Sequence, residues 1–157
     1  MNSFRFSLQR LLDAKEAFEK AAEMALAENQ RRLNSIREQL KAVKQYMKVK
    51  ISGFEESMRA KHGSSELSDH VQYLNWLDKE EARILKDIEK CESDVETARG
   101  KLLVVIRQRK SMEKLREKER RDWIIDSRRK EQALSDEASS VGYYRRGVSL
   151  KESEARS

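Results

Sequence analysis

A strict repeat of seven residues between Leu74 and Met112 constrains the fold of this chain more than any other feature. Two interleaved sets of positions follow the repeat, and the residues between them are mostly charged or amide. The two sets are Leu74, Glu81, Ile88, Val95, Leu102 and Arg109, and Leu77, Ile84, Cys91, Ala98, Val105 and Met112. A helix with this spacing carries a narrow apolar stripe, which is buried only against another helix. The repeat therefore predicts a coiled coil.

A second stripe of helical spacing, between Phe4 and Arg59, can supply the partner helix. Its members are Leu8, Leu11, Lys15, Phe18, Ala22, Ala25, Asn29, Leu33, Ile36, Leu40, Val43, Met47, Ile51, Phe54 and Met58. Two irregular steps of four residues interrupt the heptad, so we expect a shallow supercoil. Lys15 and Asn29 are polar positions in the stripe, and we expect them to fix its register.

The segment between the two stripes carries the main turn signal of the chain. Gly63 suits the end of a helix, and Ser65 or Ser68 suits the start of the next one. We predict an all-α fold, a long antiparallel two-helix coiled coil or helical hairpin, in which paired residue numbers sum to about 128. The expected elements are a first helix over about 4–60, a turn at 61–68, a second helix over about 69–138, and a frayed or disordered tail at 139–157.

The composition agrees with long helices and not with a thick core. The 157 residues include no proline, and 39% of them are charged. The single cysteine gives no internal disulfide, and the first ten residues lack the apolar run of a signal peptide. The longest apolar run, 102–106, is too short to span a bilayer. We expect a cytoplasmic protein that does not insert into the membrane.

The sequence carries no pattern that indicates catalysis. It has no glycine-rich phosphate loop and no histidine and cysteine cluster with metal-ligand spacing. His62 and His70 flank the turn without a third ligand, and we expect both to be exposed loop residues. Cys91 falls on the stripe and acts there as a small apolar residue. We therefore predict no catalytic residue, no cofactor and no metal, and a function that depends on surfaces.

Three surface features exceed what the stripe needs. Tyr73, Trp76 and Leu77 follow the turn; the run 102–106 is apolar on every side; and the segment 107–130 has an excess of basic residues. Each feature also has a structural explanation. Aromatic residues can pack the turn, and a basic run can be a solvated face. A wide apolar patch is harder to explain in this way, because soluble monomers rarely leave one open.

Three segments of the sequence carry a resemblance to a known family. They are Phe4-Arg5-Phe6-Ser7-Leu8-Gln9-Arg10-Leu11-Leu12-Asp13-Ala14-Lys15-Glu16, Tyr73-Leu74-Asn75-Trp76-Leu77, and Arg129-Lys130-Glu131-Gln132-Ala133-Leu134-Ser135-Asp136-Glu137-Ala138. Together they resemble the flagellar export protein FliJ family. The residues that match the family pattern are Phe4, Phe6, Leu8, Leu11, Leu12, Lys130, Glu131, Asp136 and Glu137. The last block has one residue more than the family's usual spacing.

The resemblance implies a non-enzymatic part of the flagellar type III export apparatus. Members form a two-helix coiled coil like the stalk of rotary ATPases, and their terminal end enters the pore of the hexameric export ATPase. The region after the turn binds the cytoplasmic domain of the membrane export gate, and members also escort export chaperones. The implied location is cytoplasmic, at the inner membrane. The implied gate-binding residues are Tyr73, Trp76 and Leu77, and the implied ATPase-binding residues are Arg109, Arg116, Arg120 and Arg121.

Two alternatives stay open at this point. A stalk protein of a virulence-type injectisome would have the same fold. A basic coiled coil with a net charge of +6 could instead bind nucleic acid. The glutamates between the basic residues argue against nucleic acid, because a duplex-binding face is strongly single-signed.

Overall fold

Two long α-helices make up the fold in the computed structural model, which describes residues 2–61 and 63–157. Helix α1 covers Gln9–Arg59 and helix α2 covers Ser64–Ala155. No strand occurs within the described ranges. The chain divides into two compact units, one of Lys15–Gln108 and one of the first fourteen residues with Arg109–Ser157. We call them the hairpin unit and the terminal unit.

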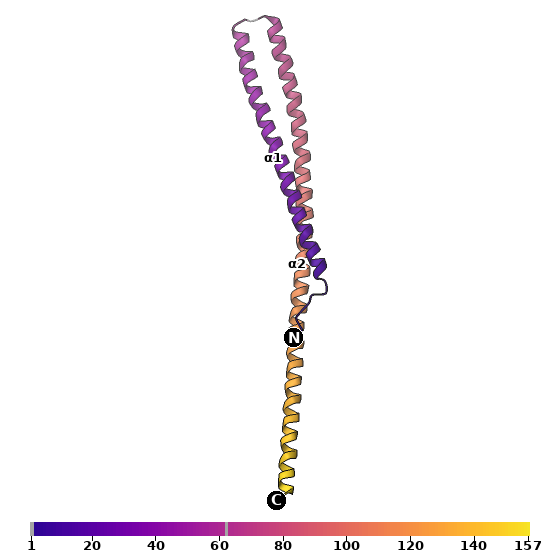
Figure 1. The fold of residues 1–157 in the computed structure, drawn as a ribbon. Coiled ribbons are helices and arrows are strands. Elements are labelled where there is room, and N and C mark those ends of the chain that lie inside the picture. The colour runs from indigo at the N-terminus through magenta and orange to yellow at the C-terminus, as the bar shows by residue number, and fades with distance from the viewer. Residues whose placement is uncertain (1, 62) are drawn as a thin grey trace. The chain divides into compact units, whose positions relative to one another are not determined.

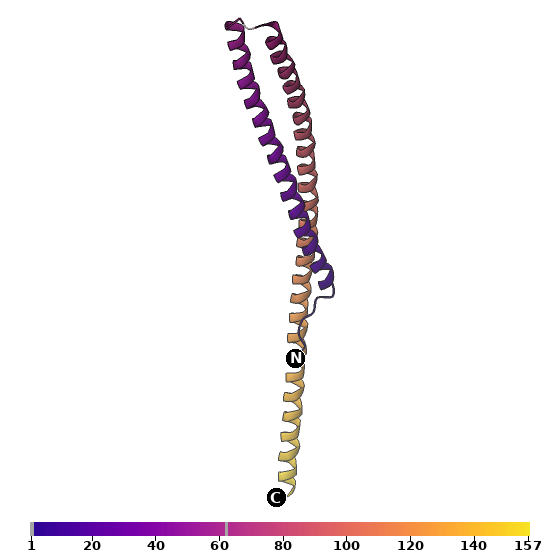
Figure 2. The same ribbon diagram turned by 45° about the horizontal axis from the view of Figure 1, so that its top comes forward.

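In the hairpin unit, α1 and α2 run antiparallel and lie side by side (Figures 1 and 2). Leu33 of α1 packs with Cys91 and Val95 of α2 in a small buried cluster. Leu26, Ile36 and Ile88 pack against this cluster. The predicted helical hairpin is confirmed. The side chain of Arg37 also pairs with Glu92 across the two helices at 3.2 Å, which is within one residue of the predicted register.

The heptad stripe of α2 is buried as predicted. All twelve of its positions are buried or half-buried. Leu77 and Ile84 are each only 2% exposed, and Cys91, Val95 and Ala98 are also buried. The stripe works as a seam because a period of seven residues keeps one narrow face of the helix toward its partner.

The stripe of α1 follows a strict heptad instead of the irregular path that we expected. Its fourteen buried or half-buried positions are Leu12, Glu19, Leu26, Leu33, Leu40, Met47 and Phe54, and Lys15, Ala22, Asn29, Ile36, Val43, Lys50 and Ser57. Six of the expected positions are exposed, namely Leu8, Leu11, Phe18, Ala25, Ile51 and Met58. Glu19 and Lys50 can occupy the seam because their methylene groups cover apolar surface while their charged ends reach water.

The turn is shorter than predicted, because α1 ends at Arg59 and α2 already begins at Ser64. The left-handed residue is Lys61, with φ of 53°, and Gly63 does not have a positive φ. The carbonyl oxygen of Gly63 accepts a hydrogen bond from the Leu67 amide at 3.4 Å, so Gly63 belongs to the start of α2. His62 lies outside the described residues.

His70 is part of the seam and not the exposed loop residue that we expected. It is half-buried, and its ring stands edge-on to Phe54 with 6.1 Å between the ring centroids. Its Nε2 atom lies 3.3 Å from the hydroxyl of Ser57 on α1. The heptad explains the difference, since His70 lies seven residues before Leu77 and so extends the buried stripe of α2 by one repeat.

The terminal unit begins with a non-helical segment, residues 2–8, that runs alongside α2 (Figures 1 and 2). Phe6 is buried, Leu12 is 1% exposed, and the Phe4 ring lies 6.1 Å from the ring of Trp123. The expectation of a helix from about residue 4 was therefore wrong. Burial of the aromatic side chains of this segment explains why it does not continue α1.

The C-terminal end of α2 also differs from the expectation of a frayed or disordered tail. The helix continues through 139–155, and the side chains beyond Ser127 are exposed. The absence of proline allows the helix to continue.

Candidate protein-binding surfaces

One candidate surface lies beside the turn in the hairpin unit, and we call Lys50, Tyr73 and Trp76 the turn surface. Tyr73 and Trp76 are 38% and 54% exposed, and their ring centroids lie 5.7 Å apart. The ammonium nitrogen of Lys50 lies 4.8 Å from the centroid of the Tyr73 ring. This geometry is a cation–π contact between α1 and α2. The turn surface therefore presents two aromatic rings and a cation.

Leu77 does not belong to this surface, although the sequence grouped it with Tyr73 and Trp76. Its side chain is almost fully buried in the seam. A helical spacing of four residues places Leu77 and Tyr73 on neighbouring parts of the helix, but the seam covers only one of them. In this conformation Leu77 packs in the seam beneath the turn surface, and its side chain cannot contact a partner.

Sequence reasoning did not assign Lys50 to this surface. Lys50, Tyr73 and His70 line a polar groove together with Ser57, Glu66 and Asp69. The heptad of α1 carries the signal that would have found Lys50, because it places this lysine on the seam opposite the start of α2. The groove combines a basic residue, two carboxylates and an imidazole, which suits a polar contact around an aromatic anchor.

A further charged pair lies one turn beyond Trp76. The guanidinium of Arg83 donates a hydrogen bond to the carboxylate of Glu80, and this bond lowers the pKa of Glu80 from its ordinary value. The same contact raises the pKa of Arg83. Both groups therefore stay charged at neutral pH, and they make the flank of α2 next to the turn surface polar.

The four predicted ATPase-binding arginines all lie in the terminal unit, but carboxylates accompany them. Arg109 pairs with Glu113 at 2.8 Å, and Arg121 pairs with Glu117 at 3.6 Å. Arg116 and Arg120 line a groove beside the Phe4 ring together with these two glutamates. The structure thus brings Arg116 and Arg120 together on an accessible face, while Arg109 is half-buried.

The apolar run 102–106 is divided between the seam and the surface. Leu102, Val105 and Ile106 are half-buried, whereas Leu103 and Val104 are 47% and 50% exposed. The run therefore leaves two aliphatic side chains open in the hairpin unit.

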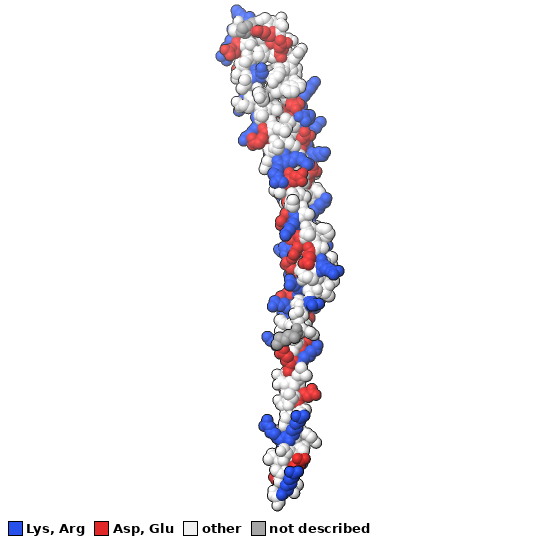
Figure 3. Space-filling view, in the orientation of Figure 1, with Lys and Arg blue, Asp and Glu red and all other residues white. Residues whose placement is uncertain are grey.

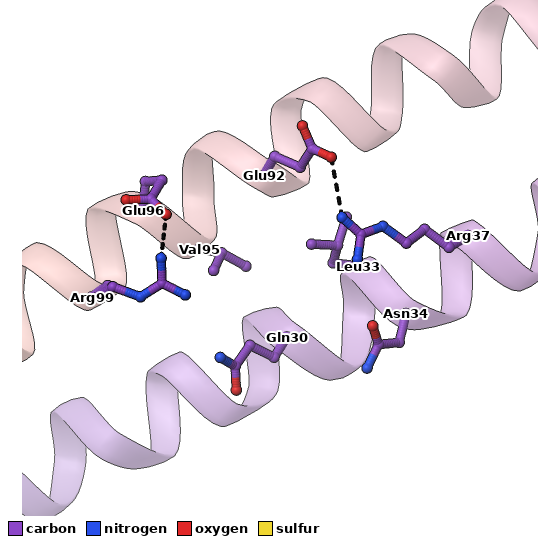
Figure 4. A pocket seen from close by; sticks show the side chains of 8 residues that line it. All are labelled: Gln30, Leu33, Asn34, Arg37, Glu92, Val95, Glu96 and Arg99. Carbon is purple, nitrogen blue, oxygen red and sulfur yellow. Dashed lines mark hydrogen bonds and ion pairs between the residues drawn. The ribbon is translucent and has the colours of Figure 1, made fainter.

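Another groove crosses the seam near Leu33 and Val95 (Figure 4). The amide side chains of Gln30 and Asn34 lie at its edge, and the Arg37–Glu92 pair crosses it. These groups offer neither a nucleophile with an adjacent base nor a pair of carboxylates facing each other. The groove is the surface of the seam. Within residues 2–61 and 63–157, no group of three potential ligands is arranged to hold a metal ion.

Basic and acidic side chains are interspersed on the visible face of each unit (Figure 3). Several pairs lie within single helices, such as Arg99 with Glu96 and Arg32 with Glu28. A surface of mixed sign differs from the single-signed face that binds a nucleic acid duplex. None of the helices in the described ranges has the length and low polarity required to cross a membrane.

In a comparison with protein families, a family model matches nearly the whole chain. The family model described as flagellar FliJ protein matches residues 4–148. The match includes the N-terminal segment, both helices and part of the C-terminal end of α2. Searches of the curated proteins and of the solved structures found no match. FliJ proteins are non-enzymatic components of the flagellar export apparatus. On this match, the chain belongs to the flagellar FliJ protein family and is a flagellar export-related protein.

Proposed function

We propose that this protein connects two parts of the flagellar export apparatus. The terminal unit binds the hexameric export ATPase, and the turn surface binds the cytoplasmic domain of the membrane export gate. The observation that carries the proposal is the family match over residues 4–148. The fold supports it, because the candidate surfaces lie on two separate units.

The turn surface suits the export gate because it resembles the centre of a protein interface. Tyrosine and tryptophan bury a large area with few rotatable bonds, and they are enriched among residues that dominate binding energy. Trp76 is 54% exposed, so it can lose much of its accessible area to a partner. Lys50 orients the ring of Tyr73 before binding, which lowers the entropic cost of the contact.

The terminal unit suits the ATPase because Arg116 and Arg120 lie on one accessible face of α2. Exposed arginines attract a carboxylate-lined entrance over a distance that salt screens. The glutamates of the same groove limit this attraction, so orientation matters more than net charge. The proposal also includes escort of export chaperones, which rests on the family alone.

Charge reversal in the terminal unit tests the ATPase part of the proposal. The variant with Arg116, Arg120 and Arg121 changed to glutamate should bind the ATPase more weakly and stimulate its activity less. A matched control changes Lys41, Lys44 and Lys48 to glutamate, which alters the net charge equally on exposed positions of α1. Equal binding by the two variants, at equal helicity in circular dichroism, would show that the basic segment is only a solvated face.

Alanine substitution in the turn surface tests the gate part. Tyr73→Ala should weaken binding to the purified gate domain by about 1–3 kcal/mol. Tyr143→Ala is the matched control, because Tyr143 is 82% exposed and lies in the terminal unit. Titration calorimetry that finds the same affinity for both variants would remove Tyr73 from the gate-binding surface.

A further inference from the structure

The last part of α2, residues 128–155, is a helix without a partner in the terminal unit, and we call it the distal segment. Five of its apolar residues share one face of the helix, whereas Tyr143 and Leu150 lie on the opposite face. The five are Leu134, Ala138, Val141, Tyr144 and Val148. Leu134 and Tyr144 are 65% and 72% exposed, so the described residues of the terminal unit leave this stripe largely uncovered.

A bare helix of this composition needs a partner to be well populated. Isolated helices are marginal in water, and most helix stability in proteins comes from packing of an apolar face. Gly142 and Gly147 lower the intrinsic helix propensity further, by about 1 kcal/mol each relative to alanine. Elsewhere the chain buries its apolar stripes between two antiparallel helices. The distal segment has the same requirement, and no described residue of the terminal unit packs against its stripe.

The charged residues beside the stripe indicate which kind of helix can pack against it. Glu137 and Arg145 lie four residues before and after Val141, and Lys130 and Glu152 lie eleven residues before and after it. An antiparallel pair of identical helices centred on Val141 therefore places opposite charges near one another. A parallel pair in register would place each of these charges against itself. In the part of the chain that the structure describes, neither Glu137 nor Arg145 has an ion-pair partner.

The apolar residues obey the same symmetry. Leu134 and Val148 lie seven residues on either side of Val141, and Ala138 and Tyr144 lie three residues on either side. Ala138 and Gly142 are small, and they leave a shallow concavity that is also lined by Leu134 and Val141. In the antiparallel arrangement the Tyr144 ring of one copy lies opposite Ala138 of the other. A large side chain thus packs into the space beside a small one, as in the knobs-into-holes packing of coiled coils.

We propose that the distal segment pairs antiparallel with the distal segment of a second copy of this chain, about a two-fold axis at Val141. The interface is isologous, since each copy contributes the same residues to both sides. The arginines assigned to ATPase binding lie outside the distal segment, so the pairing does not use them. They are Arg109, Arg116, Arg120 and Arg121.

Sedimentation velocity of the full-length chain over a concentration series tests this pairing. The unmodified chain should show a monomer–dimer equilibrium. Glu137→Arg and Arg145→Glu should each weaken the dimer about tenfold, because each change converts two attractive contacts into two repulsive ones. The double variant carrying both changes should recover the original dimerisation, since it only exchanges the two charges. Arg129→Glu is the matched control on the outer face of the helix.

Three results would overturn the proposal. The first is a single monomeric species at every concentration. The second is a double variant that dimerises no better than the single variants. The third is a loss of dimer in Arg129→Glu equal to that in Arg145→Glu. Val141→Asp provides a second check at the axis and should abolish the dimer, while circular dichroism shows that the hairpin unit stays helical.

Discussion

The ammonium nitrogen of Lys50 lies 4.8 Å from the centroid of the Tyr73 ring, and this contact joins α1 to α2 within the hairpin unit. Lys50 occupies a heptad position of α1, whereas Tyr73 lies beside the seam of α2. The turn surface is therefore built from both helices. Its shape depends on the register of the hairpin and not only on the local sequence after the turn.

A double-mutant cycle on Lys50 and Tyr73 should show favourable coupling. We expect a coupling free energy of about 0.5–1 kcal/mol, which is usual for a cation–π contact at an exposed site. Urea unfolding of Lys50→Gln, Tyr73→Ala and the double variant gives this quantity. A cycle that closes without coupling would mean that the ammonium group does not sit over the ring in solution.

Leu77→Ala should destabilise the hairpin far more than Trp76→Ala. Leu77 is buried in the seam, and removal of such a side chain costs about 2–5 kcal/mol in free energy of unfolding. Trp76 is more than half exposed, so its truncation should cost little stability and should act on binding instead. Thermal melts of the two variants decide between these roles. Similar losses of stability would show that the indole packs the turn.

Asn29→Leu should stabilise the hairpin unit. Asn29 occupies the seam of α1, and its amide donates a hydrogen bond to the Ala25 carbonyl oxygen at 3.0 Å. A leucine at this position would add apolar area to the seam and raise the free energy of unfolding by about 1 kcal/mol. The control Asn34→Leu lies on an exposed position and should change stability by less than about 0.5 kcal/mol. A lower melting temperature for Asn29→Leu would show that the asparagine is required for the register.

Phe4→Ala should change the fluorescence of Trp123. The two rings lie 6.1 Å apart in the terminal unit, so loss of the Phe4 ring exposes the indole to water. We expect a red shift of the emission in a background where Trp76 is replaced by phenylalanine. Phe18→Ala is a suitable control because Phe18 is exposed in the hairpin unit. An unchanged spectrum would mean that the N-terminal segment leaves α2 in solution.

The sequence predicted α2 better than α1, and the reason lies in which residues occupy each seam. In α2 the heptad positions are mostly aliphatic, so the pattern of apolar residues is also the pattern of burial. In α1 the seam takes Glu19, Lys50 and Ser57, while Phe18 and Ile51 next to them stay exposed. The apolar residues of α1 therefore trace an irregular path that includes exposed positions, whereas the buried positions follow a strict heptad.

The exposure of the residues near the turn follows the heptad, but the contribution of α1 does not. Tyr73 and Trp76 lie beside the seam and are exposed, Leu77 lies on the seam and is buried, and Lys50 was not assigned. The heptad separates Leu77 from Tyr73, but the sequence after the turn holds no signal for Lys50, which comes from the other helix. The N-terminal segment shows a similar limit. Its aromatic residues match a family pattern, but only the structure shows that Phe6 is buried and that Phe4 lies beside Trp123.

The short turn has a consequence for motion within the hairpin unit. Only the residues from Ala60 to Gly63 separate the two helices. Sliding one helix along the other by a single heptad would require roughly 10 Å of additional chain, at 1.5 Å for each helical residue. The turn is too short to supply this length, so a shift of register would have to unwind the end of a helix. Force applied near the turn can therefore bend the two helices or separate them, but it cannot move one past the other.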